Sequence, residues 1–186
     1  MDPDFIVIGP GRSGTTLLYQ IFRDHPDICM PLNTKEINYF NNQYHKGLDW
    51  YRSFFKYCHP QSLRGEISNT YIYDSKVPGR IQELYPAIKL ISILRNPFDR
   101  LLSAYRFRLS VGEIDPGMGI EKALKEHPDL ITDNFYGTQL ERFFLLFPKD
   151  NVYITYYDHL VHSPEIFVQN VLEFLDVSPD YDHKIV

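Results

Sequence analysis

The chain has 186 residues, of which 44% are hydrophobic and 23% charged, with a net charge of −5. This composition excludes an intrinsically disordered chain and predicts one globular domain over residues 1–186. The negative net charge provides no general basic surface, so no nucleic acid partner is expected. No apolar run approaches the roughly 20 residues of a membrane span, so no membrane association is expected.

The N-terminus and the cysteines bear on the compartment. The first residues, MDPDFIVIGPG, lack the basic region and the small-residue cleavage site of a signal peptide. Cys29 and Cys58 are the only cysteines and are too few for a disulfide framework. We therefore expect two half-buried free thiols in a reducing compartment, and a cytoplasmic protein.

Apolar runs and helical spacing alternate along the chain. Phe5–Gly9 is a short apolar run that ends at a Gly-Pro-Gly turn, which predicts a buried strand, and 15–23 has the apolar spacing of a helix. Further strands are expected at 28–30, 64–68, Lys89–Leu94 and Val152–Tyr156, and further helices at 49–56, 78–84, 97–109, 133–147 and 164–175. This alternation predicts a single α/β domain with a mainly parallel sheet flanked by helices. The least regular part is 31–69, where loops can carry function.

The loop between the first strand and the first helix reads GPGRSGTT. A loop in this place points backbone N–H groups and the helix dipole at an anion, so it predicts a phosphate site. One interpretation is the dinucleotide motif G-x-G-x-x-G, but the region where a second strand should end in an acidic residue is broken by Pro26 and Pro31. Another is the Walker A loop, but Thr15 stands where that loop has its lysine, which weakens the case for ATP or GTP chemistry.

A third interpretation fits the differences from those two motifs. The cation has moved to Arg12, and the helix starts Gly14-Thr15-Thr16. This stretch resembles the 5′-phosphosulfate loop, RSGTTLL or KTGTT, of the sulfotransferases that use 3′-phosphoadenosine 5′-phosphosulfate (PAPS). The resemblance implies a P-loop-like sulfotransferase fold. It also implies that the donor is held by Gly11, Arg12, Ser13, Gly14, Thr15 and Thr16, with Arg12 stabilising the leaving side.

A second motif supports this interpretation. Residues 90–105 read LISILRNPFDRLLSAY, with Arg95 at the end of a buried strand and Ser103 about two helical turns later. A guanidinium can bind a phosphate through two hydrogen bonds, and a hydroxyl adds a third. In the family, this arginine and this serine bind the 3′-phosphate that distinguishes PAPS from ATP. Taken alone, the stretch would be an ordinary helix start with surface charges.

The middle of the chain resembles the glycan-modifying branch, which includes the heparan sulfate sulfotransferases. The segment TKEINYFNNQYHKGLDWYRSFF is similar to its pattern KE-x-x-FF…Y-x-x-G-x-x-WY, whose glutamate is the general base and corresponds to Glu36. His45 and His59 are weaker rivals for this role. The branch's E-K-[ST]-P segment reads Glu66-Ile67-Ser68-Asn69 here, so its lysine is missing.

The resemblance implies transfer of a sulfuryl group from PAPS to an acceptor hydroxyl or amine, with a saccharide as the expected acceptor and 3′,5′-diphosphoadenosine (PAP) as the product. No metal is expected. Tyr136 is either an aromatic residue near the nucleotide or a core tyrosine. Positive residues of the irregular region either attract an anionic glycan or form a solvated surface: Lys35, Lys46, Arg52, Lys56 and Arg64.

Two other functions stay open on the sequence. One is an adenosine-nucleotide-binding module without catalysis, and the other is a P-loop small-molecule kinase. The first is suggested by the chain's end at DHKIV, because the family usually has a later basic, glycine-containing loop that covers the adenosine. We therefore expect that loop to be absent from residues 1–186.

Overall fold

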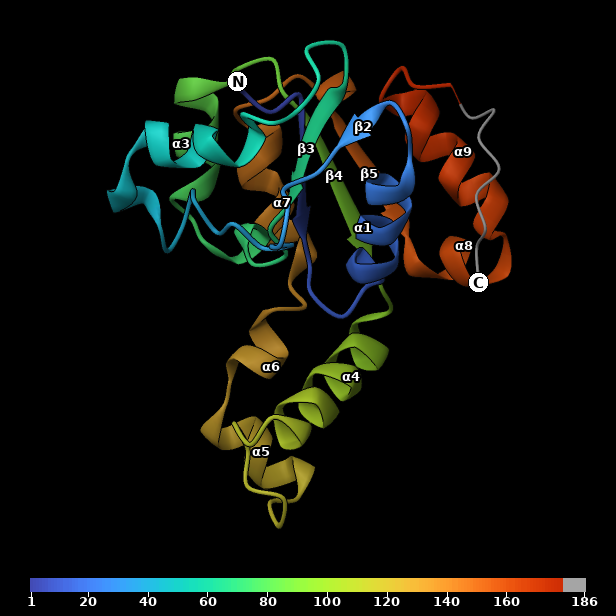
Figure 1. Cartoon of the computed structure of the whole chain (residues 1–186). Helices are drawn as coiled ribbons and strands as arrows, with labels where there is room; N and C mark the ends of the chain where they lie inside the picture. Colours follow the sequence, from blue (N-terminus) through green and yellow to red (C-terminus); the bar gives the residue numbers. More distant parts are fainter. Residues whose placement is uncertain (179–186) are drawn as a thin grey trace.

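A parallel sheet forms the centre of the computed structural model, which describes residues 1–178 (Figure 1). Its strands are β1 (Phe5–Gly9), β2 (Ile28–Cys29), β3 (Leu63–Ile67), β4 (Lys89–Leu94) and β5 (Val152–Tyr156). They lie in the order β2-β3-β1-β4-β5, and each neighbouring pair is parallel. The predicted α/β fold is confirmed, and every predicted strand is present within one or two residues.

Helices cover both faces of the sheet because strand residues alternate between the two sides. Phe5 and Val7 pack with one apolar cluster, which includes residues of α1 (Thr15–Asp24), α8 (Tyr157–His162) and α9 (Pro164–Phe174). Ile6 and Ile8 pack with the other cluster, which includes residues of α3 (Val77–Leu84) and α7 (Tyr136–Phe144). Strand β1 is buried on both faces, which explains its continuous apolar sequence.

A group of helices projects from the carboxyl end of the sheet (Figure 1). It consists of α4 (Pro97–Ser110), α5 (Ile120–Glu126) and α6 (Asp129–Thr132). Helix α4 starts at Asn96, whose side chain accepts hydrogen bonds from the N–H groups of Phe98 and Asp99 at 3.0 and 3.4 Å. This cap and the following proline define the helix start. The group has its own small core, formed by Ala104, Ile114, Ala123 and Leu130.

The predicted helix 133–147 is wrong at its start. The chain forms α6, leaves the helical conformation after Thr132 and starts α7 at Tyr136. Asn134 lies in the break, where its side-chain amide donates to the Leu130 carbonyl at 2.7 Å and its oxygen accepts from Arg100 at 2.6 Å. A long-range contact therefore fixes the break, and helical periodicity does not reveal such a contact. Helices α5, α6 and α8 were not predicted.

The irregular region is held by aromatic packing. It contains α2 (Leu48–Arg52) and the short 3-10 helices Tyr44–Lys46 and Ser53–Phe55, and two more such helices lie at Tyr71–Tyr73 and Lys149–Asn151. Tyr39 stacks on Tyr51 with ring centres 4.5 Å apart, and Phe40 meets Tyr51 and Tyr71 edge to face. This part of the chain therefore forms a packed cap over one side of the sheet.

The two cysteines are bonded, which corrects the expectation of free thiols. Cys29 of β2 and Cys58 form a disulfide with a Cα–Cα distance of 5.8 Å. A pair of cysteines is too few for a framework, but one bridge needs only two chain segments that the fold brings together. Sequence spacing alone did not show that 29 and 58 are neighbours.

The disulfide also removes one of the two observations on which the cytoplasmic prediction rested, the expected free thiols. Disulfides persist in oxidising compartments and are rare in the cytoplasm. The argument for a reducing compartment therefore no longer holds.

No helix within residues 1–178 is long and apolar enough to cross a bilayer.

Candidate functional site

The candidate site lies where parallel strands end. The segments that follow β1, β3, β4 and β5 meet at the carboxyl edge of the sheet, where α/β proteins bind ligands. After β1, the chain forms β2 and β3 on one side of β1 and then β4 and β5 on the other side. The strand order therefore reverses beside β1. A cavity of about 420 Å³ opens at this point. It is lined by Arg12, Gly14, Thr15, Thr16, Asn69, Arg95, Ser103, Phe107 and Tyr157.

The loop after β1 has the backbone needed to bind an anion. Gly14 caps α1 with φ 91°, a conformation that favours glycine, and a Cβ there would lie 2.5 Å from the Leu160 side chain. Gly9 has φ 108°, and its Cα faces the Asn69 carbonyl so closely that a Cβ would lie 2.2 Å from that oxygen. These glycines let the loop turn tightly and present the first N–H groups of α1 to the cavity.

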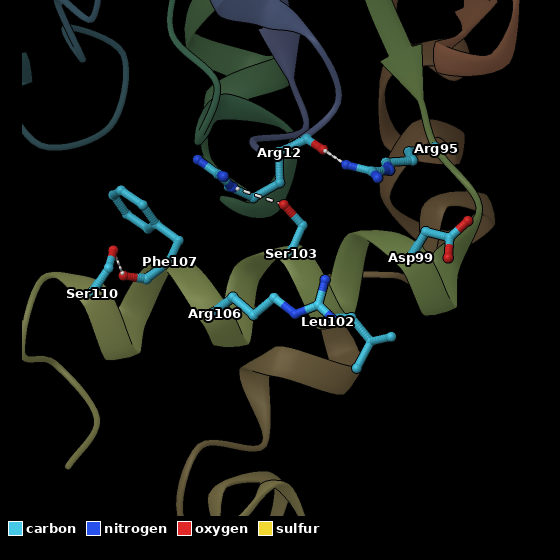
Figure 2. Close-up of a pocket in the computed structure, with 8 residues that line it drawn as sticks. All are labelled: Arg12, Arg95, Asp99, Leu102, Ser103, Arg106, Phe107 and Ser110. Atoms are coloured by element: carbon cyan, nitrogen blue, oxygen red, sulfur yellow. Dashed lines mark hydrogen bonds between the residues drawn. The ribbon is translucent and has the colours of Figure 1, made fainter. Parts of the chain in front are cut away.

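The predicted Arg95 and Ser103 lie beside this loop. Arg12 Nε donates to Ser103 Oγ at 3.2 Å, and Arg95 Nη1 donates to the Arg12 carbonyl at 3.1 Å (Figure 2). The Arg12 guanidinium lies over the Phe107 ring at 4.7 Å, and that of Arg95 over the Tyr157 ring at 4.3 Å. The structure therefore brings the two sequence motifs, more than eighty residues apart, into one site.

A second cavity, of about 340 Å³, continues along α4 from the first. Figure 2 shows its wall, with Arg12 and Arg95 above the helix and Arg106 on the helix itself. Three guanidinium groups and one carboxylate, that of Asp99, line it. This wall is suited to a ligand with negative charge.

Two buried polar atoms near the loop make no hydrogen bond. They are the Ser13 hydroxyl and Nε of Arg95. Ser13 is fully buried. Burial of a polar atom without a partner is unfavourable, so such atoms point to a ligand or water that completes the site.

Glu36, the residue expected to be the base, lies next to the same loop. Its carboxylate accepts a hydrogen bond from the Asn69 N–H at 2.7 Å and pairs with the Lys35 ammonium at 2.5 Å. The Lys35 ammonium also donates to Thr15 Oγ1 at 3.2 Å. Glu36 is thus fixed beside the cavity through Asn69 and Lys35, and about a quarter of its side chain (26%) is exposed.

A second carboxyl group lies buried behind this one. Glu66 is fully buried in β3, where it accepts hydrogen bonds from Tyr51 at 2.9 Å and from Ser68 at 3.4 Å. Burial raises its pKa from 4.5 to about 8, against the opposing hydrogen bonds of Tyr51, Tyr71 and Ser68. The nearby negative charge of Glu36 raises it further. Glu66 is therefore protonated at neutral pH.

Some predicted site residues line neither cavity, although Gly11 and Ser13 belong to the phosphate loop. Tyr136 begins α7 and is half-buried, and it lines neither of the two cavities along the loop and α4. The Gly11 backbone bonds to the Tyr73 hydroxyl, and Ser13 lies beneath the loop. His45 and His59 are exposed in the cap region and line neither cavity.

The basic residues of the irregular region do not act as one group. Arg52 pairs with Asp2, and Arg64 pairs with Asp4. Lys46 lies over the Trp50 ring at 4.4 Å. Only Lys35 of this set contacts the phosphate loop in the structure.

Sequence reasoning missed three residues that line the cavity. Asn69 and Tyr157 each lie just past the end of a parallel strand, and the carboxyl-edge rule could have selected them. Phe107 lies one turn after Ser103 on α4, so helical spacing could have selected it. Within residues 1–178, no group of three or more His, Cys, Asp or Glu residues could hold a metal ion.

These features define a class of protein. A glycine loop at a helix N-terminus, an arginine after the neighbouring strand and a serine on the next helix form a phosphate-binding site on a parallel α/β fold. The family follows from comparison with known proteins: the model of the sulfotransferase domain matches residues 2–185. The chain therefore belongs to the sulfotransferase domain family, and the prediction of this family is confirmed.

Curated relatives come from the branch that the middle segment resembles. The chain is 30% identical to the bifunctional heparan sulfate N-deacetylase/N-sulfotransferase 3 of Mus musculus, over 98% of this chain and 23% of that protein. It is also 30% identical to the heparan sulfate glucosamine 3-O-sulfotransferase 5 of Mus musculus, over 95% of this chain and 54% of that protein. The chain thus spans about a quarter and about half of the length of these relatives.

Solved structures share the fold. A sulfotransferase from Alicyclobacillus acidocaldarius superposes with a TM-score of 0.86 at 23% identity, over 97% of this chain and 83% of that one. A mouse sulfotransferase complexed with PAP superposes with a TM-score of 0.63 at 19% identity, over 95% of this chain and 59% of that one. At these identities the comparison establishes the fold.

Proposed function

We propose that this chain transfers a sulfuryl group from PAPS to a hydroxyl or amine of a saccharide. The observation that carries the proposal is the joining of the phosphate loop to Arg95 and Ser103 in one cationic cavity. A donor with phosphate groups on both sides of its ribose suits a site with a helix N-terminus at one end and an arginine–serine pair at the other. The unpaired Ser13 hydroxyl and Arg95 Nε fit such an anionic ligand.

On the donor side, each residue of the site has its own proposed role. The loop N–H groups with Thr15 and Thr16 hold the 5′-phosphosulfate, Arg12 stabilises the charge that develops on the leaving oxygen, and Arg95 and Ser103 hold the 3′-phosphate. Gly11 and Ser13 shape the loop. The donor supplies an activated sulfuryl group, and the product is PAP.

On the acceptor side, Glu36 takes the proton of the attacking hydroxyl or amine. Its hydrogen bond from the Asn69 N–H holds the carboxylate at the edge of the cavity. The saccharide acceptor is supported by the heparan sulfate enzymes among the relatives. Tyr136, half-buried at the start of α7, is proposed to contribute to the wall on the nucleotide side.

The test of the donor is a thermal-shift titration with PAP, ATP with Mg²⁺, and NAD. A ligand that binds the folded state raises the melting temperature with concentration. We expect a shift with PAP and a much smaller shift with the other two. Arg95→Ala should weaken PAP binding by about 10- to 100-fold, because a hydrogen bond to a charged group contributes about 1.5–3 kcal/mol.

Each alternative function predicts a different result. A P-loop kinase would bind ATP with Mg²⁺ in preference to PAP. A nucleotide-binding module without catalysis would bind PAP but would not transfer labelled sulfate from PAPS to N-deacetylated heparan sulfate. Binding of PAP that is unchanged in Arg95→Ala would contradict the assignment of the 3′-phosphate site.

A further inference from the structure

Lys35 lies between the two halves of the site. Its ammonium is 3.2 Å from Thr15 Oγ1 on the phosphate loop and 2.5 Å from the Glu36 carboxylate. Only 19% of its side chain is exposed. A long flexible side chain that is held this far from solvent, in contact with both elements, is a fixed part of the site.

The electrostatics of this position favour an anion. Thr15 is the first residue of α1, so the Lys35 ammonium lies at the positive end of that helix dipole. The first turn of α1 contains no acidic residue. Among the described residues, Glu36 is the ion-pair partner of Lys35, so one carboxylate balances both the helix end and the ammonium. A bound group with negative charge would complete this balance.

Lys35 is also the cation on the side of the phosphate loop that faces Glu36, the proposed base. The Arg12 guanidinium is turned the other way, onto Ser103 and Phe107 of α4. The Arg95 guanidinium is engaged with the Arg12 carbonyl and the Tyr157 ring. In a direct transfer, the moving group lies between the loop that holds the donor and the carboxylate that takes the acceptor's proton. Lys35 bridges these two elements.

We propose that Lys35 is a further catalytic residue, which binds the non-bridging oxygens of the transferring sulfuryl group; this inference rests on the proposed function. In the reaction, the bond between sulfur and the bridging oxygen of PAPS breaks, and its electron pair stays on the 5′-phosphate of PAP. A bond forms between sulfur and the acceptor oxygen or nitrogen, and the acceptor's proton moves to Glu36. Lys35 stays protonated throughout and stabilises the negative charge of the sulfuryl group in transit.

The experiment compares two ligands that differ only in the sulfuryl group. The dissociation constants of PAPS and PAP are measured by calorimetry for the wild type, Lys35→Met and Lys35→Arg. Lys35→Met should weaken PAPS binding about tenfold and leave PAP binding within about twofold, because only PAPS carries the group that the ammonium contacts. Lys35→Arg keeps the charge and should retain most of the preference for PAPS. Lys125→Met, which removes an exposed lysine of α5, is the matched control and should change neither constant.

The outcomes separate this inference from the proposed function. A wild type that binds neither ligand contradicts the proposed function. A wild type that binds both, with an unchanged ratio of the two constants in Lys35→Met, overturns the role of Lys35. An equal loss of both affinities also overturns it, since Lys35 would then act on the loop or the shared phosphate. If Lys35→Met does not fold, Lys35→Gln provides the same comparison.

Discussion

Glu36 and Glu66 show how position divides two nearby carboxyl groups into different roles. Glu36 lies at the cavity edge, partly exposed, with one backbone hydrogen bond and one ion pair. Glu66 lies fully buried among hydroxyl groups, and burial raises its pKa to about 8. Glu36 is the carboxylate proposed to take the acceptor's proton, whereas burial favours the protonated form of Glu66.

The role of Glu36 as the base can be tested by Glu36→Gln. The amide keeps the size and the hydrogen bond from Asn69 but cannot take a proton, so the transfer rate should fall by about 10²- to 10⁴-fold. Affinity for PAP should stay unchanged, because Glu36 lies on the acceptor side. The rate is measured with labelled PAPS and N-deacetylated heparan sulfate, and Glu83→Gln, an exposed position on α3, is the control. A rate close to that of the wild type would assign the base to another residue.

The raised pKa of Glu66 leads to a prediction about how stability depends on pH. In the unfolded chain it ionises near pH 4.5, whereas in the folded chain it stays protonated up to about pH 8. Between these values the folded state binds more protons, so the free energy of unfolding falls as the pH rises through this window. The shift of a few pKa units corresponds to a loss of about 3–5 kcal/mol.

The variant Glu66→Gln removes this titration and keeps a hydrogen-bond acceptor for Tyr51. Between pH 5 and pH 8 the variant should therefore lose less stability than the wild type, by about 3 kcal/mol. Urea unfolding at the two pH values measures the difference. Parallel pH profiles of the two proteins would show that Glu66 is ionised in the folded state at neutral pH.

At the scale of elements, α4 joins the site to the rest of the fold. One face carries Ser103 and Phe107 toward the phosphate loop. One turn earlier on the helix, the buried Arg100 donates to Asn134 at 2.6 Å and to the Tyr73 hydroxyl at 3.0 Å. The same helix thus positions Ser103, the serine proposed to bind the 3′-phosphate, and fixes the break between α6 and α7.

The loop–helix junction depends on Gly14. Gly14→Ala would place a Cβ at φ 91° and 2.5 Å from the Leu160 side chain. The backbone strain costs about 1–2 kcal/mol, and the clash adds to it, so the free energy of unfolding should fall by about 2–4 kcal/mol. PAP affinity should fall as well, because the first N–H groups of α1 would shift.

The matched control for this variant is Gly79→Ala. Gly79 lies within α3, where a Cβ would meet nothing within 4 Å. This substitution should leave PAP binding unchanged and raise the free energy of unfolding by about 0.5–1 kcal/mol, because alanine favours the helix. Chemical denaturation and PAP titration of both variants make the comparison. A Gly14→Ala protein as stable and as tight-binding as the wild type would refute the proposed role of this turn.

At the scale of the whole molecule, the disulfide ties the cap to the sheet. It joins β2 to Cys58 across a separation of 29 residues, and the segment between them carries Lys35, Glu36 and the aromatic cap. A crosslink that closes a loop of this length stabilises a protein by about 3–4 kcal/mol, chiefly by restricting the unfolded chain.

Reduction should therefore lower the melting temperature by about 5–15 °C. Thermal unfolding is measured with and without reductant, on the wild type and on the double variant Cys29→Ser/Cys58→Ser. The double variant should melt at the temperature of the reduced wild type and should not respond to reductant. An identical melting temperature in both conditions would mean that the bridge contributes nothing to stability.

Local sequence determined much of this protein. The apolar runs specified the strands, because a strand buried on both faces needs continuous apolar residues. The glycine loop and the spacing of Arg95 and Ser103 indicated a phosphate site, because anion binding needs N–H groups, a guanidinium and a hydroxyl at set places. Each of these features depends on residues that are adjacent in the sequence or separated by a fixed helical spacing. The family match confirmed the sulfotransferase family that they indicated.

Tertiary structure alone decided the rest. It paired Cys29 with Cys58, broke the helix at Asn134, buried Glu66 and placed Lys35 against Thr15. Each of these depends on residues distant in the chain that meet only when the sheet forms, so no local pattern encodes them. The charge of a carboxyl, the state of a thiol and the direction of a lysine are set by such neighbours, and the chemistry of the site depends on them.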